Sequence, residues 1–274
     1  MIRKPSDENY KSSTYVVALA RGLAVLGCFN AIRPELGTAD IAKLTGLPQP
    51  TVWRLCNTLV EHGCLVRHAN RDKLTIGLGL LGFGYAALPS LNLGELAEME
   101  MKKLADDLSA GVSLCIPDNL EMLIIKRVRG YKGLLSGGVV GARLPIVTSA
   151  SGWAYLATLP AATVDGLTEE LQEQLALDPI AKLCGRDWSE LRAIIAAEFL
   201  RYKEHGFVIN AALYRPEINY AAVPIEVDNG VYTLHCSGLA SVLPLHILET
   251  EVGPRLAEMA ARLRIGLGRS GDIF

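Results

Sequence analysis

The sequence predicts an α+β protein with an N-terminal winged helix-turn-helix and a larger C-terminal domain in which helices and strands alternate. Three observations lead to this prediction. The 274 residues are ample for two domains. Apolar residues near the N-terminus recur at helical spacing, with a glycine between two short helices. Residues 1–90 carry ten Lys/Arg and six Asp/Glu, whereas residues 91–274 carry 17 and 23, which is typical of a nucleic-acid-facing head on an acidic body.

The composition indicates a chain that folds throughout, since 50% of its residues are hydrophobic and 20% are charged. The apolar runs stop short of the roughly 20 residues that a membrane span needs, so we expect no transmembrane helix. Residues 1–14 are polar and lack the pattern of a secretion signal, which indicates a disordered arm on a cytoplasmic protein. The six cysteines lack metal-ligand spacing, so we expect buried thiols, no metal site and no cofactor.

Three helices are expected at the start of the chain. The first covers residues 16–29, and its buried face should consist of Val16, Leu19, Leu23 and Leu26. The second begins at an N-cap, Thr38, and ends at Gly46. Its buried face should consist of Ile41, Ala42 and Leu44. The third has Pro50 in its first turn and ends at Gly63, with Val52, Leu55, Cys56 and Leu59 on its buried face.

The outward side of the third helix offers side chains that can bind the edges of bases and phosphates. They are Gln49, Thr51, Trp53, Arg54 and Asn57. A solvated helix face is the alternative, but an outward tryptophan favours contact with DNA or a partner helix. We add Thr38, at the start of the preceding helix, to the expected DNA contacts.

A small hairpin should follow, formed by residues 64–67 and 73–76 around the polar segment His68–Asp72. Arg67, Arg71 and Lys73 lie at or near its tip. A basic hairpin beside a recognition helix can lie along the phosphate backbone, although surface hairpins with three cations are also common.

The rest of the chain predicts a mixed sheet with helices on its faces. Helices are expected at residues 91–109, 149–159, 187–205 and 245–267, and strands at 112–116, 122–129, 207–210, 219–227 and 231–237. Asp187 and Glu190 form a capping pattern, and the Asp228-Asn229-Gly230 segment is a strong turn signal.

No enzyme motif stands out, so we expect no catalytic residues. Ser149 or Ser151 could form a hydrolase pair with His205 or His235, but nothing in the sequence orients them. A binding pocket is better supported, because alternation along residues 231–237 places Thr233, His235 and Ser237 on one face and apolar side chains on the other. A solvated polar face is the simpler alternative.

Long motifs extend from about Tyr15 to about Gly268 in a recognisable order. They are ARGLAVLGCFN, TADIAKLTGLPQPTVWRLCNTLVEHGCLVR, LTIGLGLLGFG, GARLPIVTSASGWAYLATLP, EHGFVIN, YAAVPIEVDNGVYTLHCSG and PRLAEMAARLRIGLG. The chain thereby resembles the IclR-type (isocitrate-lyase-regulator) bacterial transcription factors. The resemblance implies a winged helix-turn-helix at 15–77, a linker helix at 78–90 and an effector-binding domain similar to GAF and PAS folds at 91–274. It also implies homodimers and homotetramers, with Leu78, Leu81, Gly82 and Tyr85 in a helix seam unless the linker packs on its own domain.

The resemblance also implies an effector cavity and the residues around it. These are Gly141, Ala142, Asn210, Tyr220, His235 and Ser237, with paired backbone amides at the first two positions suited to a carboxylate. Trp153 replaces a residue that is usually basic in the family, and Asn210 replaces a common acid. Both departures disfavour small hydrophilic effectors such as glyoxylate. With Tyr220, His235 and Trp153 or Tyr155 near the cavity, an aromatic or phenylpropanoid-type acid would fit, although Trp153 could also be a core residue. The segments VGARLP, TSASG and GRSG also resemble those of the family's regulators of aromatic-acid degradation.

The expected function is therefore that of a DNA-binding transcriptional regulator whose affinity for double-stranded operator DNA is controlled by a small organic acid. Repressor and activator are equally open. Two rivals are kept: a ligand sensor whose winged helix mediates protein association, and an esterase-like enzyme.

Overall fold

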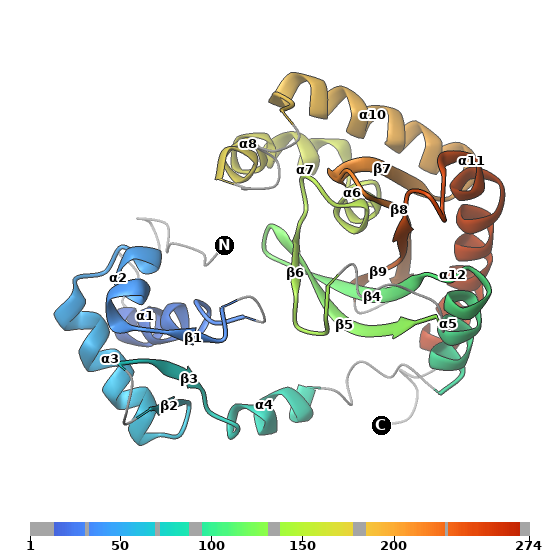
Figure 1. The fold of residues 1–274 in the computed structure, drawn as a ribbon. Helices are drawn as coiled ribbons and strands as arrows, with labels where there is room; N and C mark the ends of the chain where they lie inside the picture. The colour runs from blue at the N-terminus through green and yellow to red at the C-terminus, as the bar shows by residue number, and fades with distance from the viewer. Residues whose placement is uncertain are drawn as a thin grey trace. The chain divides into compact units, whose positions relative to one another are not determined.

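The computed structural model describes residues 14–30, 33–68, 72–87, 95–130, 138–177, 185–227 and 230–268. The chain divides into two compact units, Met1–Asn92 and Leu93–Phe274, each described here by itself (Figure 1). Most of the predicted N-terminal arm, Arg71, the end of the predicted linker helix after Ala87 and the turn at residues 228–229 lie outside the described residues.

The N-terminal unit has the predicted winged helix-turn-helix. Its helices are α1 (Val17–Leu26), α2 (Thr38–Thr45), α3 (Gln49–Glu61) and α4 (Leu80–Ala87), and its strands are β1 (Glu35–Leu36), β2 (Leu65–Arg67) and β3 (Leu74–Ile76). The strands form an antiparallel sheet in the order β1-β3-β2, so the wing is the β2–β3 hairpin as predicted. Strand β1 was not predicted, because two residues are too few to show a periodic pattern.

The turn between α2 and α3 depends on backbone geometry at its ends. Gly46 has a φ of 70°, and its N–H donates to the Ala42 carbonyl at 2.9 Å, so a left-handed residue ends α2 as predicted. The predicted N-cap Thr38 is wrong by one position: Gly37 is the N-cap, and its N–H donates to the Asp40 carboxylate at 3.0 Å. Asp40, three residues after Gly37, thus accepts the backbone N–H of the N-cap residue, a donor that the side chain of a serine or threonine at the cap does not satisfy.

The core of the N-terminal unit corrects part of the predicted helix faces. It contains Val25, Cys28, Phe29, Leu36, Ile41, Val52, Cys56, Leu65 and Leu74. Three of the four residues expected to be buried on α1 are instead exposed: Val16 at 62%, Leu19 at 62% and Leu23 at 60%. Leu44 is also exposed. Helical periodicity identifies an apolar stripe, but it does not show which surface covers that stripe.

The C-terminal unit is a curled six-stranded sheet with helices on both faces. Its strands are β4 (Gly111–Asp118), β5 (Glu121–Arg129), β6 (Arg143–Pro145), β7 (Val208–Arg215), β8 (Ile218–Val227) and β9 (Gly230–Leu239), in the order β6-β5-β4-β9-β8-β7. Every pairing among these strands is antiparallel, so the predicted mixed sheet is wrong. Helices inserted between hairpins gave an alternation of helix and strand that suggested parallel neighbours.

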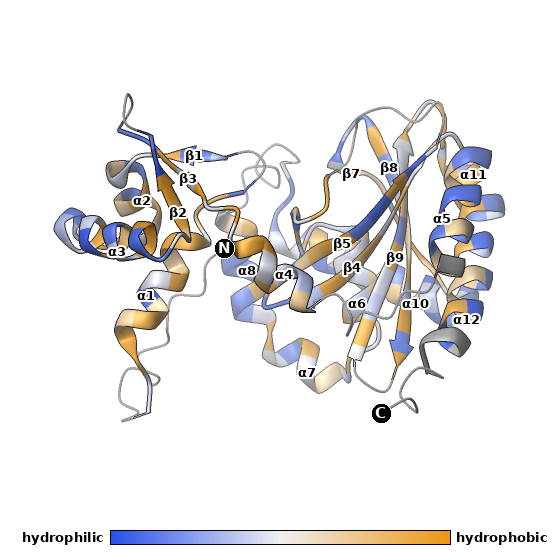
Figure 2. Ribbon diagram, turned by 90° about the horizontal axis from the view of Figure 1, so that it is seen from below, coloured by the Kyte–Doolittle hydropathy of each residue, from blue (hydrophilic) through white to orange (hydrophobic). Residues whose placement is uncertain are grey.

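Two layers of helices cover the faces of this sheet (Figures 1 and 2). One layer contains α5 (Glu95–Asp107) and α12 (Gly253–Gly268), which pack on one apolar core. The other contains α6 (Ala150–Leu156), α8 (Thr168–Leu177) and α10 (Trp188–His205), which pack on a second core. Helix α10 starts at the predicted Asp187 cap, whose carboxylate accepts the Glu190 N–H at 2.9 Å.

Some C-terminal elements differ from the prediction. Strand β6, helix α7 (Ala161–Gly166) and helix α8 were not predicted. The expected single helix at 245–267 is divided into α11 (Leu245–Ile247), a π-helical turn (Leu248–Val252) and α12. At this break the ring of Phe207 packs closely against Gly253, where a Cβ atom would overlap the ring. Among the described residues, no helix combines the length and apolar character needed to cross a membrane.

Candidate functional site

Helix α3 presents its polar residues outward because its other side is fixed in the core. Val52 and Cys56 are fully buried. Gln49, Trp53 and Arg54 are exposed, with Trp53 at 53%, whereas Thr51 and Asn57 are half-buried. The helix therefore carries a solvent-facing amide, guanidinium and indole over its first two turns, and these groups can reach base edges and phosphates in a major groove.

The wing is attached to α3 by a hydrogen bond between side chains. Arg67 Nη2 donates to Asn57 Oδ1 at 2.7 Å, although Arg67 lies on β2 and Asn57 in the middle of α3. Arg67 also lies 3.9 Å from the Asp72 carboxylate. Two of the predicted DNA contacts thus hold each other in position, which orders the wing against the helix before any ligand binds.

The other described wing cation has a carboxylate partner. Lys73 Nζ lies 2.9 Å from Asp40 Oδ2 at the start of α2. The hydrogen bond from Lys73, followed by that from the Gly37 N–H, lowers the pKa of the Asp40 carboxyl. A phosphate that contacts Lys73 must therefore compete with Asp40.

The predicted DNA contact at Thr38 is wrong for the side chain. Thr38 is only 6% exposed, because it occupies the first turn of α2 on the side that faces the core.

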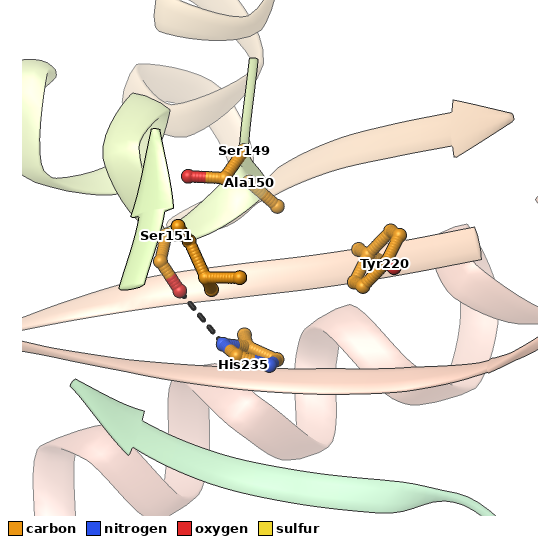
Figure 3. A pocket seen from close by; sticks show the side chains of 6 residues that line it. Ser149, Ala150, Ser151, Tyr220 and His235 are labelled. Carbon is orange, nitrogen blue, oxygen red and sulfur yellow. Dashed lines mark hydrogen bonds between the residues drawn. The ribbon is translucent and has the colours of Figure 1, made fainter. Parts of the chain in front are cut away.

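A pocket lies in the C-terminal unit where the start of α6 meets strands β8 and β9 (Figure 3). It has about 220 Å³ of empty space, part of which is open to solvent, and it is lined by Leu144, Ser149, Ala150, Ser151, Tyr220 and His235. Ser149 caps α6, because its Oγ accepts the Gly152 N–H at 3.1 Å. The cap directs the first turn of α6, with Ser151, onto the sheet.

His235 forms the polar floor of this pocket. Its Nδ1 lies 2.7 Å from Ser151 Oγ and 3.6 Å from Cys115 Sγ, and its ring meets the Tyr220 ring edge-on at 6.2 Å between centroids. Burial, and then the charge of Arg127, lower the pKa of His235 to about 3. His235 is therefore neutral at pH 7, with one ring nitrogen as donor and the other as acceptor.

The structure brings together one of the hydrolase pairs considered from the sequence, Ser151 with His235 (Figure 3). General-base catalysis is most effective when the base has a pKa near the working pH, so an imidazole with a pKa of about 3 is a poor acceptor for the serine proton. Ser149 is used as a helix cap, and His205 is exposed on α10. Within the described ranges, no group of acids, histidines and cysteines is arranged to hold a metal ion.

Two residues predicted to bind the effector have structural roles here. Trp153 is fully buried and its indole N–H donates to the Val147 carbonyl at 2.8 Å, so the core interpretation of this residue is correct. Asn210 donates from Nδ2 to the Thr148 carbonyl at 2.8 Å and accepts the Leu213 N–H at 3.3 Å, which supports the irregular turn in β7.

The backbone amides of Gly141 and Ala142 are not open donors either. Gly141 N–H donates to the Ile124 carbonyl at 2.8 Å, and Ala142 N–H donates to the Val139 carbonyl at 2.9 Å. Gly141 has a φ of 85°, so this turn needs glycine for its conformation. Neither amide is therefore open to a carboxylate in this structure, and the role of the two amides in effector binding stays a prediction.

The structure also adds residues that the sequence analysis missed. Ser113 on β4 pairs with His235 on β9, and Arg127 on β5 pairs with Ser113, so the three are neighbours across the sheet. Arg127 Nη1 donates to Ser113 Oγ at 2.8 Å. Burial is the main cause that lowers the pKa of Arg127. Arg127 stands between Lys126 and Val128 at the end of a predicted strand, where cations are ordinary surface residues, so no signal in the sequence singled it out.

Comparisons with known proteins agree with this arrangement. Residues 18–69 match the IclR helix-turn-helix domain, and residues 85–244 match the C-terminal domain of the bacterial transcriptional regulator IclR. The HTH-type transcriptional regulator TsaQ1/TsaQ2 of Comamonas testosteroni is 28% identical over 261 residues, which cover 93% of this chain and 90% of that protein.

Solved structures show the same fold. The crystal structure of an IclR family transcriptional regulator from Brucella abortus has a TM-score of 0.81 and 31% identity, and the alignment covers 97% of this chain and 98% of that one. An IclR homologue from Microbacterium hydrocarbonoxydans, solved in complex with 4-hydroxybenzoate, has a TM-score of 0.69 and 22% identity over 92% of this chain and 99% of its own.

Fold and site together define a transcriptional regulator with a DNA-binding helix-turn-helix and a C-terminal effector-binding domain. The expected fold class is thereby confirmed. The chain belongs to the IclR family.

Proposed function

We propose that the exposed side of α3 contacts operator bases and that the wing contacts phosphates. The base-reading side chains in this proposal are Gln49, Thr51, Trp53, Arg54 and Asn57. Arg67, Arg71 and Lys73 contribute backbone contacts, and Lys73 exchanges Asp40 for a phosphate. The observation that carries this proposal is the outward position of Trp53 and Arg54, because an indole that is 53% exposed lacks cover within its own unit.

We propose further that the pocket beneath α6 binds a small organic acid with an aromatic body. Leu144 and Ala150 offer apolar walls, Tyr220 offers a ring, and His235 with Ser151 offers hydrogen bonds. Only about 10 Å³ of this space admits the centre of a water molecule, which is room for about one water, so an aromatic ring enters only if the lining side chains move. One relative of this fold is known with 4-hydroxybenzoate bound, and this compound is a suitable first probe.

Self-association completes the proposal. The stripe Val16, Leu19 and Leu23 on α1 is exposed. So are Leu81 and Tyr85 on α4, at 57% and 66%. These exposures favour pairing of two copies over packing of α4 on its own unit. Two heads could then contact half-sites about one DNA turn apart, roughly 34–36 Å. The effector acts by favouring one arrangement of the paired heads, and the chain works as a cytoplasmic regulator without catalysis.

Fluorescence anisotropy with labelled DNA from upstream of the protein's own gene tests this function. We expect the logarithm of affinity to fall linearly with the logarithm of salt concentration, since several phosphates are contacted. We also expect 4-hydroxybenzoate or a related acid to change that affinity. A protein that binds this acid but shows no specific, salt-dependent DNA binding would support the rival function, a sensor whose winged helix associates with proteins.

A further inference from the structure

A polar cluster lies on the same face of the sheet as the pocket, between strands β5 and β9. Its members are Arg127 on β5, Ser113 on β4 and Ser237 on β9. Ser113 is fully buried and Ser237 is 2% exposed. Arg127 donates to Ser113 Oγ at 2.8 Å, and Ser237 pairs directly with the pocket residue Tyr220. The cluster is thus continuous, through β8 and β9, with the pocket walls.

Gly111 provides the space that the guanidinium of Arg127 occupies. A Cβ atom on Gly111 would overlap Nη2 of Arg127 and would lie 3.3 Å from Ser237 Oγ. Glycine inside a strand is unfavourable unless another group approaches closely, and here that group is the end of Arg127. The guanidinium therefore extends across β4 toward Ser237, which is the neighbour of the pocket residue Tyr220 on the adjacent strand.

The electrostatic surroundings of the cluster suit an anion. The groups that most affect the pKa of Arg127, apart from burial, are Arg129, Tyr220, Cys115 and Cys236. Burial raises the pKa of both thiols to about 12, so they are neutral at pH 7. His235 is neutral as well, so among these groups the positive charge nearest to His235 is that of the Arg127 guanidinium. A carboxylate there gains charge-assisted hydrogen bonds in a low-dielectric setting.

We propose that Arg127 binds the carboxylate of the effector, with Ser113 positioning the guanidinium and Gly111 leaving room for it. The aromatic body of the effector then lies against Tyr220 and Ala150, and its far polar group meets His235. This inference rests on the proposed effector function and deepens it: the recognised class is monocarboxylates, and the anchor is a side chain on β5 rather than the amides of Gly141 and Ala142.

Calorimetric titration of the full chain with 4-hydroxybenzoate and its uncharged analogue 4-hydroxybenzamide tests the anchor. We expect the unchanged protein to bind the acid more tightly than the amide. Arg127→Gln should weaken acid binding roughly 10- to 100-fold and leave amide binding within about threefold, because only the acid makes a charge-assisted bond. Lys126→Gln is the matched control, since Lys126 pairs with Glu98 and carries the same charge one residue away.

Gly111→Ala tests the geometry without changing any charge. The added methyl group displaces the flexible end of Arg127, so acid binding should weaken about tenfold or more while the melting temperature changes little. DNA binding by the N-terminal unit and the circular dichroism spectrum report whether each variant is folded.

The outcomes separate the two levels of inference. Suppose that the unchanged protein binds the acid. If folded Arg127→Gln then binds the acid equally well, or if its affinities for the acid and the amide fall by the same factor, Arg127 is not the carboxylate anchor, and the effector pocket stands. If the unchanged protein binds neither this acid nor benzoate or phenylacetate, the aromatic-acid part of the proposed function fails and the anchor fails with it.

Discussion

The two tryptophans Trp53 and Trp153 show how differently the two units use the same side chain. Trp53 projects from α3 and is 53% exposed, whereas Trp153 in α6 is fully buried and donates its indole N–H to Val147. Polar groups differ in the same way. Arg54 on α3 is exposed, but His235 and Ser237 on β9 are 2% exposed.

This difference indicates two kinds of recognition. A polyanion such as DNA is attracted over distance to solvated cations, and salt weakens that attraction. A small molecule in a buried pocket is recognised instead by a few fixed hydrogen bonds, which are strong where the local dielectric is low. Helix α3 therefore exposes Gln49 and Arg54, whereas the pocket of the C-terminal unit buries His235 and Ser151, at a cost in stability that hydrogen bonds offset.

The largest effect is expected for the buried tryptophan. Trp153→Ala should lower the free energy of unfolding by about 3–5 kcal/mol, because it removes a large core side chain and leaves the Val147 carbonyl unpaired. Trp53→Ala should change it by less than about 0.5 kcal/mol. Urea denaturation followed by circular dichroism compares the two. Equal losses for both variants would contradict the distinction drawn here.

A smaller effect is expected on DNA affinity. Arg54→Ala should weaken operator binding by roughly 10- to 100-fold, as expected for loss of a base-reading arginine, with no change in unfolding. Fluorescence anisotropy at fixed salt measures the operator affinity. The control is Glu61→Ala, which also replaces a charged residue of α3 by alanine but at the other end of the helix. Full affinity in a folded Arg54→Ala protein would remove α3 from the DNA interface.

The pH dependence of stability should reveal the buried imidazole. His235 has a pKa of about 3 when folded and an ordinary value near 6.5 when unfolded, so the unfolded chain binds the proton more readily between these values. Stability is complete above pH 6.5 and decreases as pH falls, by about 1 kcal/mol between pH 6.5 and pH 5.5.

His235→Gln should flatten this part of the curve of unfolding free energy against pH. An unchanged slope in His235→Gln would show that the imidazole is protonated within the fold.

The smallest effect concerns the wing. Arg67→Ala breaks the hydrogen bond to Asn57, and both groups lie at the surface, so the free energy of unfolding should change by less than about 0.5 kcal/mol. Operator affinity should fall a few-fold, with a salt slope smaller by about one contact. Anisotropy across a salt series measures both. A large loss of stability would mean that this bond holds the wing together.

Much of the fold could be predicted from local signals. Gly46 and Gly206 end α2 and α10, and Asp187 begins α10, because caps act through their immediate neighbours. The alternation along β9 correctly separated Leu234 and Cys236 from His235 and Ser237. The wing hairpin was similarly clear. These features depend on a few adjacent residues, so the sequence contains them directly.

Other features depend on partners far along the chain and could not be predicted. The antiparallel order β6-β5-β4-β9-β8-β7 brings Ser113 beside His235, although more than a hundred residues separate them. Which side of α1 is covered, and whether Trp153 faces a cavity or the core, are equally long-range matters. Arg127 was missed because the position of its guanidinium depends on Gly111 and Ser237, which lie on other strands of the sheet.

By itself, the sequence determined the helix-turn-helix and the polar face of the last strand, because periodicity and capping are local properties of the chain. The class of protein followed from the resemblance of its long motifs to a known family. The tertiary structure alone decided which polar groups meet. Packing placed His235 against Ser151 in a site that suppresses its charge, and it directed Arg127 across Gly111 toward Ser237.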